Sequence, residues 1–229
     1  MERVKKVWCA VVVLVVTFLS SCTMDSERLS LGCWVSMEQT GASAAKVRVR
    51  LEDASGNVPT GARVLLETPA AALSWLYFDN ETNMYETSLT SPISGDYTVS
   101  VRSTLGNVES VVPYVSLSAT PTVQTLQDAE GTTAGGNKSL KSSLAISASW
   151  QAIAGATAYQ VAVMQGASTI VIVSTTGTSY VFPPGTFTSG KTYALRVEAQ
   201  YIAGDPYLRD KDYYAFSYSD SPDYYFTTE

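Results

Sequence analysis

Apolar and polar side chains alternate along most of this chain, with a period of two and almost no helical pattern. In the clearest run, 46–52, Val47, Val49 and Leu51 share one side while charged residues fill the other. Alternate residues of a β-strand point to opposite faces, so this run predicts a strand with one buried face. Similar runs predict further strands at 29–37, 62–67, 73–78, 84–89, 97–102 and 108–117.

Residues typical of turns separate these runs, among them Gly56-Asn57 and Gly106-Asn107. Short strands with regularly placed turns and no helix predict a β-sandwich over 31–118. Two motifs in this part, GNVPTGARV at 56–64 and SGDYTV at 94–99, resemble bacterial immunoglobulin-like domains related to the carboxypeptidase regulatory module. In that family the second motif closes the sheet with a Gly-x-Tyr turn.

The alternation continues in the second half of the chain. Leu144, Ile146, Ala148 and Trp150 share one side of their run, which places Trp150 at the end of a row that faces a core. Other strands are expected around Val123 and Leu126 and at 159–163, 169–175, 180–182, 193–201 and 224–226.

The order of these motifs resembles a fibronectin type III domain. The matching residues are Trp150, Gly155-Ala156, Tyr159-x-Val161, GTSY at 177–180, GKTYALRVEA at 190–199 and FTT at 226–228. The resemblance implies that Trp150 is the core tryptophan and that Tyr193 is the corner tyrosine, whose hydroxyl ties down a loop. The segment 202–223 is longer than a plain hairpin of that family. The expected fold class is all-β, with two tandem β-sandwiches, the first Ig-like and the second fibronectin type III-like.

Two places could separate these domains. Residues 117–121 end in Pro121, which is suited to open a new unit, whereas 130–143 is rich in Gly, Ser and Thr and is typical of a flexible linker. We place the boundary after residue 118, because Val123 and Leu126 then supply a first strand to the second domain, 119–229. The stretch 130–143 becomes a loop within it.

The first residues have the pattern of a secretory signal. Basic residues precede a mostly apolar run, 7–19, which is too short to cross a bilayer, since a membrane helix needs roughly 20 apolar residues. The run ends in Leu19-Ser20-Ser21-Cys22, which resembles the lipobox of bacterial lipoproteins. The resemblance implies a signal peptide, 1–21, that is removed, and a short tether, 22–30, that is lipidated on Cys22. An ordinary signal peptide and an uncleaved anchor are the alternatives.

The lipoprotein resemblance also indicates where the protein resides. We expect a cell-envelope protein held to the membrane by its lipid anchor. In some bacteria, a lipoprotein with Asp directly after the lipidated Cys is retained in the inner membrane. This chain has Thr23 at that position, which favours the outer membrane. Removal of Glu2, Arg3, Lys5 and Lys6 leaves 12 basic and 20 acidic residues, a formal charge of −8. Such a surface repels phosphate backbones, so no nucleic-acid partner is expected.

The residue types exclude several kinds of catalytic site. The chain has no His, so Ser-His-Asp, Cys-His and His-based metal sites are impossible. Cys33 falls on the apolar side of its run and is interpreted as a small buried hydrophobe rather than a reactive thiol. Asp205, Asp210 and Asp212 could share a Ca²⁺, but a solvated loop is preferred because no Asp-x-Asp-x-Asp-Gly series is present. We expect no enzyme, no cofactor and no metal site.

Tyrosine is concentrated near the C terminus, where seven of the fourteen follow residue 200. A sandwich core uses one side of a strand, so it cannot bury both sides of 213–218. Exposed tyrosine rings give contact area and keep a hydroxyl suited to a protein or a sugar. We therefore predict ligand contact by Tyr207, Tyr213 and Tyr214. The alternative is that this segment forms an extra hairpin that covers a sheet edge or packs on the first domain.

Together these patterns predict a non-catalytic binding or adhesion module whose partner is a protein or glycan at the cell surface. The alternative is a structural subunit docked in an envelope or surface-layer assembly. An accessory part of a polysaccharide-degrading system is the least expected. The fold does not decide among these functions, because sandwich folds host many functions.

Overall fold

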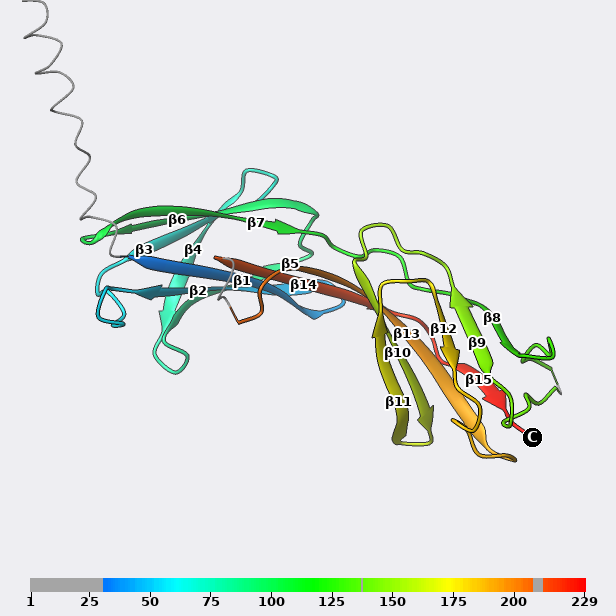
Figure 1. Cartoon of the computed structure of the whole chain (residues 1–229). Coiled ribbons are helices and arrows are strands. Elements are labelled where there is room, and N and C mark those ends of the chain that lie inside the picture. Colours follow the sequence, from blue (N-terminus) through cyan, green and yellow to red (C-terminus); the bar gives the residue numbers. More distant parts are fainter. Residues whose placement is uncertain (1–30, 137, 208–211) are drawn as a thin grey trace, which may run out of the picture.

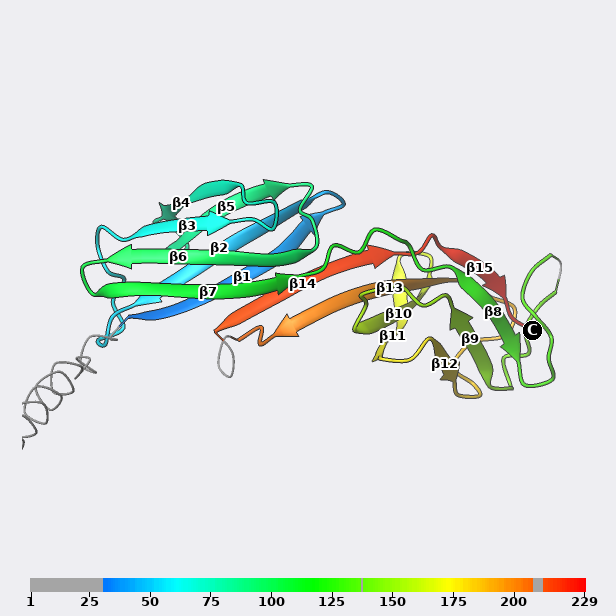
Figure 2. The same cartoon turned by 90° about the horizontal axis from the view of Figure 1, so that it is seen from above.

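The computed structural model describes residues 31–136, 138–207 and 212–229, which form strands and turns and no helix. The strands build two β-sandwiches that lie end to end (Figure 1). Residue 31 lies at one end of the molecule and the C terminus at the other (Figure 2). The predicted all-β class with two tandem sandwiches is confirmed. None of the described segments forms a helix that is long and apolar enough to span a membrane. The predicted signal peptide and lipidated tether, 1–21 and 22–30 with Cys22, lie outside the described residues.

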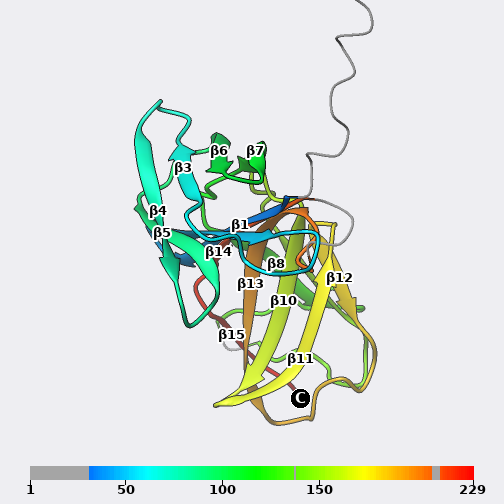
Figure 3. The same ribbon diagram turned by 90° about the vertical axis from the view of Figure 1, so that its left-hand side faces the viewer.

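The first sandwich contains seven consecutive strands and one strand from near the C terminus. They are β1 (Gly32–Gly41), β2 (Ala44–Glu52), β3 (Arg63–Glu67), β4 (Leu73–Asp79), β5 (Met84–Thr90), β6 (Gly95–Ser103), β7 (Gly106–Tyr114) and β14 (Tyr213–Asp220). One layer has the order β14-β1-β2-β5 and the other β4-β3-β6-β7. The first half of β4 pairs with β3 and its end pairs with β5, so β4 joins the two layers along one side (Figure 3).

The apolar sides of these strands meet in one core. Val35, Val49, Leu66 and Val99 are fully buried there. Because burial of such a side chain stabilises a fold by about 1.5–3 kcal/mol, the alternation that predicts the strands also drives the two layers together. Cys33 belongs to this core, and burial, with the charge of Asp212, raises the pKa of its thiol to about 12. Its interpretation as a buried hydrophobe is confirmed.

The second sandwich contains the remaining seven strands. Its strands are β8 (Val123–Asp128), β9 (Ile146–Trp150), β10 (Ala158–Gln165), β11 (Ser168–Thr175), β12 (Ser179–Phe182), β13 (Thr192–Gly204) and β15 (Tyr224–Thr227). The sheet β12-β9-β8 packs on β11-β10-β13, and β15 pairs with β13. Trp150 is buried in this core, and the Tyr193 hydroxyl accepts a hydrogen bond of 2.8 Å from the backbone N–H of Thr188. Both predicted roles are confirmed.

One continuous sheet connects the two sandwiches. β13 pairs with β10 of the second sandwich and with β14, and β14 pairs in parallel with β1 of the first. Ala215 of β14 is fully buried in the first core. An uncovered β1 would present unpaired N–H and C=O groups, and β14 satisfies them. The predicted boundary after residue 118 therefore divides neither the sheets nor the cores, because 119–229 lends β14 to the first sandwich and Leu117, before the boundary, packs in the second core.

Contacts of the connecting segment fix this join. Ser217 Oγ donates a hydrogen bond to the carbonyl of Val115, and the Tyr201 hydroxyl donates one of 3.2 Å to the carbonyl of Pro113. Gly155 lies against the same segment at φ +87°, and a Cβ there would come within 2.6 Å of Val115 Cγ1. Glycine is required at this position both for its backbone conformation and for the close approach.

Candidate functional site

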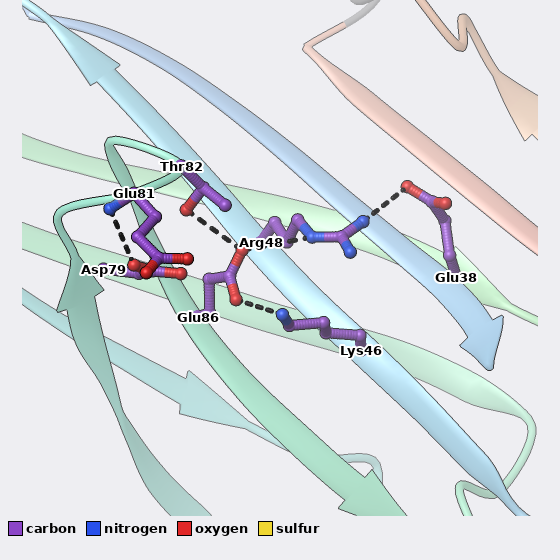
Figure 4. Close-up of polar contacts among 7 residues, drawn as sticks. All are labelled: Glu38, Lys46, Arg48, Asp79, Glu81, Thr82 and Glu86. Atoms are coloured by element: carbon purple, nitrogen blue, oxygen red, sulfur yellow. Dashed lines mark hydrogen bonds and ion pairs between the residues drawn. The ribbon is translucent and has the colours of Figure 1, made fainter.

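One outward side of the first sandwich carries a balanced network of charges on β1, β2 and β5 (Figure 4). Arg48 Nε lies 3.2 Å from Glu86 Oε1, and Arg48 Nη1 lies 3.4 Å from Glu38 Oε1. Lys46 pairs with the second oxygen of Glu86, and Thr82 donates a hydrogen bond of 3.2 Å to the first. We call this side the charged face and define it by Glu38, Lys46, Arg48 and Glu86.

The network neutralises the cations of β2. Burial alone would raise the pKa of Glu86, but the hydrogen bonds from Lys46 and Thr82 and the positive charges of Lys46 and Arg48 outweigh it and lower that pKa. Arg50, the remaining cation of β2, lies 3.0 Å from a carboxylate oxygen of Glu52. The charged face is therefore compensated within the sandwich.

The outward side of β3, β4, β6 and β7 is different. On β4, Leu73, Trp75 and Tyr77 point outward with 63%, 50% and 74% of their surface exposed. Their strand is apolar on both sides, so one row must face water, and Leu76 of the other row is buried. With Arg63 and Arg102 these three residues define what we call the aromatic face.

Arg63 and Arg102 stand directly opposite each other on β3 and β6. The next residues on this side, Leu65 and Ser100, are also partners, and Leu65 faces Trp75 across β3 and β4. These five side chains line a hollow of about 220 Å³. Neither arginine forms an ion pair with any residue of the described ranges. The aromatic face thus combines an exposed indole with positive charge that the described part of the sandwich does not compensate.

Two further hollows lie on the first sandwich, and one of them adjoins the first. One, of about 340 Å³, shares Ser100 and Arg102 and extends to Asn107 and Glu109 of β7. The other, of about 490 Å³, lies at the end of β4 and is lined by Tyr77 and Phe78. The aromatic face therefore has room for a ligand that extends across several strands.

A larger hollow, about 710 Å³, lies where the two sandwiches meet. It is lined mainly by small side chains of the β1–β2 turn and the connecting segment, together with Tyr218 and Asp220 of β14. Asp220 is its one charged lining residue. Its lining residues supply hydroxyl groups but no cation and no indole, whereas the aromatic face supplies both, so the aromatic face is the stronger candidate.

The structure separates the three tyrosines that the sequence predicts as a site. Tyr213 is half-buried and packs against the first core. Tyr214, the next residue of β14, points outward, and burial and the charge of Glu38 raise the pKa of its hydroxyl. Tyr207 lies after β13 and is 76% exposed. The segment takes the alternative arrangement, in which it covers an edge and packs on the first sandwich. Ligand contact by the three tyrosines stays a prediction.

The acidic residues do not assemble into a metal site in the described part of the chain, where no group of three potential ligands occurs. Asp205 accepts a hydrogen bond from the backbone of Tyr207 at 2.8 Å, as a solvated loop residue does. Asp210 lies outside the described residues.

Sequence reasoning missed the aromatic face because it followed the abundance of tyrosine. The available signal was the run 73–78, which has apolar residues at both parities and therefore cannot bury all of them in one core. The sequence does not predict that Arg63 and Arg102 are neighbours, because 39 positions separate them and only the pairing of β3 with β6 brings them together.

Comparison with known proteins adds little to this geometry. No protein-family model and no curated protein matches the chain. Among solved structures, a cytokine receptor complex is similar over 86% of this chain and 95% of that chain, with 10% sequence identity and a TM-score of 0.37. A similarity this low carries no conclusion about ligand or partner.

Proposed function

We propose that this protein is a lipid-anchored cell-envelope protein that acts as a non-catalytic binding or adhesion module through its aromatic face. The observation that carries the proposal is the exposure of Leu73, Trp75 and Tyr77 beside two arginines that form no ion pair among the described residues. Exposed apolar side chains that lie together and are rimmed by polar groups mark interaction sites. On the charged face, by contrast, Lys46 and Arg48 are already paired with carboxylates of the same sandwich.

The N-terminal sequence supports membrane attachment through Cys22. Each buried CH₂ of an acyl chain contributes about 0.8 kcal/mol, so the several chains of a lipoprotein hold it stably, whereas one chain alone holds it marginally. In the sequence, the predicted tether, 22–30, directly precedes the first sandwich, whose first strand is β1 (Gly32–Gly41). Thr23 favours the outer membrane as the site of attachment.

The partner we infer is a protein or glycan at the cell surface. The mature formal charge of −8 disfavours nucleic acid. Binding through exposed rings and guanidinium groups needs no cofactor and no metal.

The decisive experiment replaces Trp75 and Tyr77 together by Ser. The detergent-solubilised variant and wild type are applied to immobilised glycans and matrix proteins. We expect the wild type to bind at least one of these surfaces and the variant to lose that binding while keeping its melting temperature. Tyr225→Ser is the matched control, because Tyr225 is 68% exposed but belongs to the second sandwich. Undiminished binding by the double variant would refute the assignment of the aromatic face.

A separate experiment tests the anchor. Cys22→Ser should move the protein from the detergent phase to the aqueous phase in a phase-partition assay, or leave it unprocessed. Unchanged partitioning would rule out lipidation at Cys22.

The structural-subunit alternative is favoured by a different feature, the edge strand β11. It pairs with β10 alone among the described strands, contains no charged residue and exposes Ile170 by 42% and Ile172 by 59%. Uncharged edges of this kind accept strands from other chains. Ile172→Lys should abolish stoichiometric co-purification with an envelope protein if that alternative holds, and should leave binding at the aromatic face unchanged.

A further inference from the structure

The aromatic face places two like charges together, and neither has an ion-pair partner in the part of the chain that the structure describes. Arg63 and Arg102 are directly opposed on β3 and β6. Like charges at opposed positions destabilise a sheet, and no carboxylate of the described residues forms an ion pair with either group. Departures from the rules of sheet stability are expected where a binding site requires them. A ligand that brings negative charge to this position would relieve the repulsion.

The chemistry of the hollow specifies the negative group. A guanidinium binds a carboxylate through two parallel N–H···O bonds, and two guanidinium groups on one hollow can hold a single carboxylate between them. The hollow beside them, about 220 Å³, is smaller than the roughly 300 Å³ at which pockets for drug-sized ligands begin. It therefore suits one ring-sized unit at a time. Trp75 supplies that hollow with an exposed indole.

We propose that the aromatic face binds an acidic saccharide, with the ring of a uronic acid against Trp75 and its carboxylate between Arg63 and Arg102. The C–H groups of a sugar ring carry partial positive charge and stack on the electron-rich face of an indole. This inference rests on the proposed binding function of the same face and names the class of its ligand.

The adjoining hollow extends the site to a second sugar unit. It shares Ser100 and Arg102 with the first and is completed by Asn107 and Glu109 of β7. Asn107 can exchange hydrogen bonds with sugar hydroxyls, and Glu109 can accept them but repels a second carboxylate. The site thus favours a chain in which a neutral unit, or one with its carboxylate turned away, follows the uronic acid.

An acidic peptide is the competing ligand, and the topology disfavours it. Peptides commonly bind a sheet by adding a strand to an open edge. β3 and β6, which carry the two arginines, are each paired on both sides, whereas residues 73–76 of β4 pair with β3 alone. Because neighbouring strands lie about 4.8 Å apart, a strand added to that open edge of β4 would lie about 14 Å from β6 and would not cover the hollow between the arginines. Recognition here must come from side chains alone, which favours a ligand with ring faces, hydroxyls and a carboxylate.

Calorimetric titration of the detergent-solubilised protein with a hexamer of galacturonic acid tests the proposal, and a hexamer of glucuronic acid provides a second stereochemistry. The methyl ester of each hexamer is the matched neutral probe, hexaglutamate represents an acidic peptide, and inorganic phosphate represents a simple anion. Arg102→Gln and Trp75→Leu remove the two recognition elements separately. Lys138→Gln is the control, since it removes one exposed positive charge from the second sandwich.

We expect at least one uronate hexamer to bind more tightly than its methyl ester, and added salt to weaken the difference. Arg102→Gln should weaken uronate binding about tenfold or more and leave the ester nearly unaffected, because a charge-assisted hydrogen bond is lost. Trp75→Leu should weaken both probes, and Lys138→Gln neither.

Equal binding of uronate and ester, tighter binding of hexaglutamate, or binding of phosphate alone would overturn the acidic-saccharide assignment. So would the absence of binding by either uronate. If Trp75→Ser/Tyr77→Ser still loses capture on the immobilised surfaces in that case, the binding function of the face stands and only its ligand class is wrong.

Discussion

The charged face and the aromatic face belong to the same sandwich but treat exposed charge in opposite ways. On the charged face Glu86 sits between Lys46 and Arg48, so each cation has a carboxylate within reach. On the aromatic face Arg63 and Arg102 face each other beside exposed rings. The ion pairs of the charged face stabilise the sandwich. The two arginines of the aromatic face keep N–H donors that a ligand could use. This contrast supports our proposal that the aromatic face is the binding surface.

The largest expected effect separates a tryptophan of the core from one of the aromatic face. Trp150→Ala should lower the free energy of unfolding by about 3–5 kcal/mol, because the lost ring leaves a cavity. Trp75→Ala should change it by less than about 1 kcal/mol, since half of that side chain is already exposed. Urea unfolding followed by circular dichroism measures both. A comparable loss in the two variants would mean that the aromatic face is structural.

The next effect concerns the charged face. Glu86→Ala should cost about 1–2 kcal/mol in urea unfolding, more than an isolated surface pair, because Glu86 is largely buried and serves two cations. Glu109→Ala, on the aromatic face, is the control and should have little effect. If both substitutions are neutral, the charged face is not stabilised by its network.

The same carboxylate predicts a dependence on pH. Because the pKa of Glu86 is lowered in the folded protein, its contribution is present above the unfolded pKa and is lost as the pH falls through the folded pKa. Glu86→Gln should therefore flatten part of the decline of the melting temperature in acid. An unchanged acid profile would contradict the role of this ion pair.

A smaller effect of opposite sign is expected on the aromatic face. Arg102→Gln should leave stability unchanged or raise it by about 0.2–1 kcal/mol, because it relieves the repulsion from Arg63. Arg48→Gln is the matched control and should destabilise, since Arg48 contacts two carboxylates. A clear loss of stability in Arg102→Gln would show that its guanidinium has a structural partner.

The smallest effect lies where the sheet of the charged face continues into the second sandwich. Glu198 stands opposite Asp220, and burial is the main reason that its pKa is raised. The hydrogen bond from Gln200 lowers that pKa, and the charge of Asp220 raises it, without changing the upward direction. The folded protein thus binds this proton more tightly, so the contribution is complete below the unfolded pKa and is lost as the pH rises through the folded pKa.

Glu198→Gln should accordingly raise the melting temperature at neutral pH, and the gain should disappear in acid. Partial exposure screens the charges, which keeps the effect small. Thermal unfolding of wild type and variant across this pH range measures it. Glu67→Gln, at an exposed position of β3, should show no such trend.

Most strand positions could be predicted from the sequence. The run 73–78 corresponds to β4 (Leu73–Asp79), and the run 46–52 lies within β2 (Ala44–Glu52). The prediction of 108–117 extended too far, because β7 ends at Tyr114 and Leu117 turns into the second core. The apolar alternation continues past Tyr114, but Tyr114 is buried in the first core and Leu117 in the second.

The candidate site was much less predictable. Tyr213 and Tyr214 were predicted as ligand contacts because their strand has rings on both sides. In the structure β14 lies between β13 and β1, and both side chains are half-buried there. Trp75 sits on a strand with the same two-sided pattern and remains half exposed. The two segments have the same two-sided apolar pattern in the sequence. They differ in how far the neighbouring strands and their side chains cover the rings.

The sequence by itself determined most of the strands and the side of each that enters a core, because a period of two is a local property of the backbone and its side chains. The roles of Trp150 and Tyr193 followed from the resemblance to fibronectin type III domains. Only the tertiary structure decided that β14 joins β1 and that Arg63 meets Arg102. Strand partners and register depend on hydrogen bonds and packing between segments far apart in the chain, and no local pattern encodes which of two apolar sides another strand will cover.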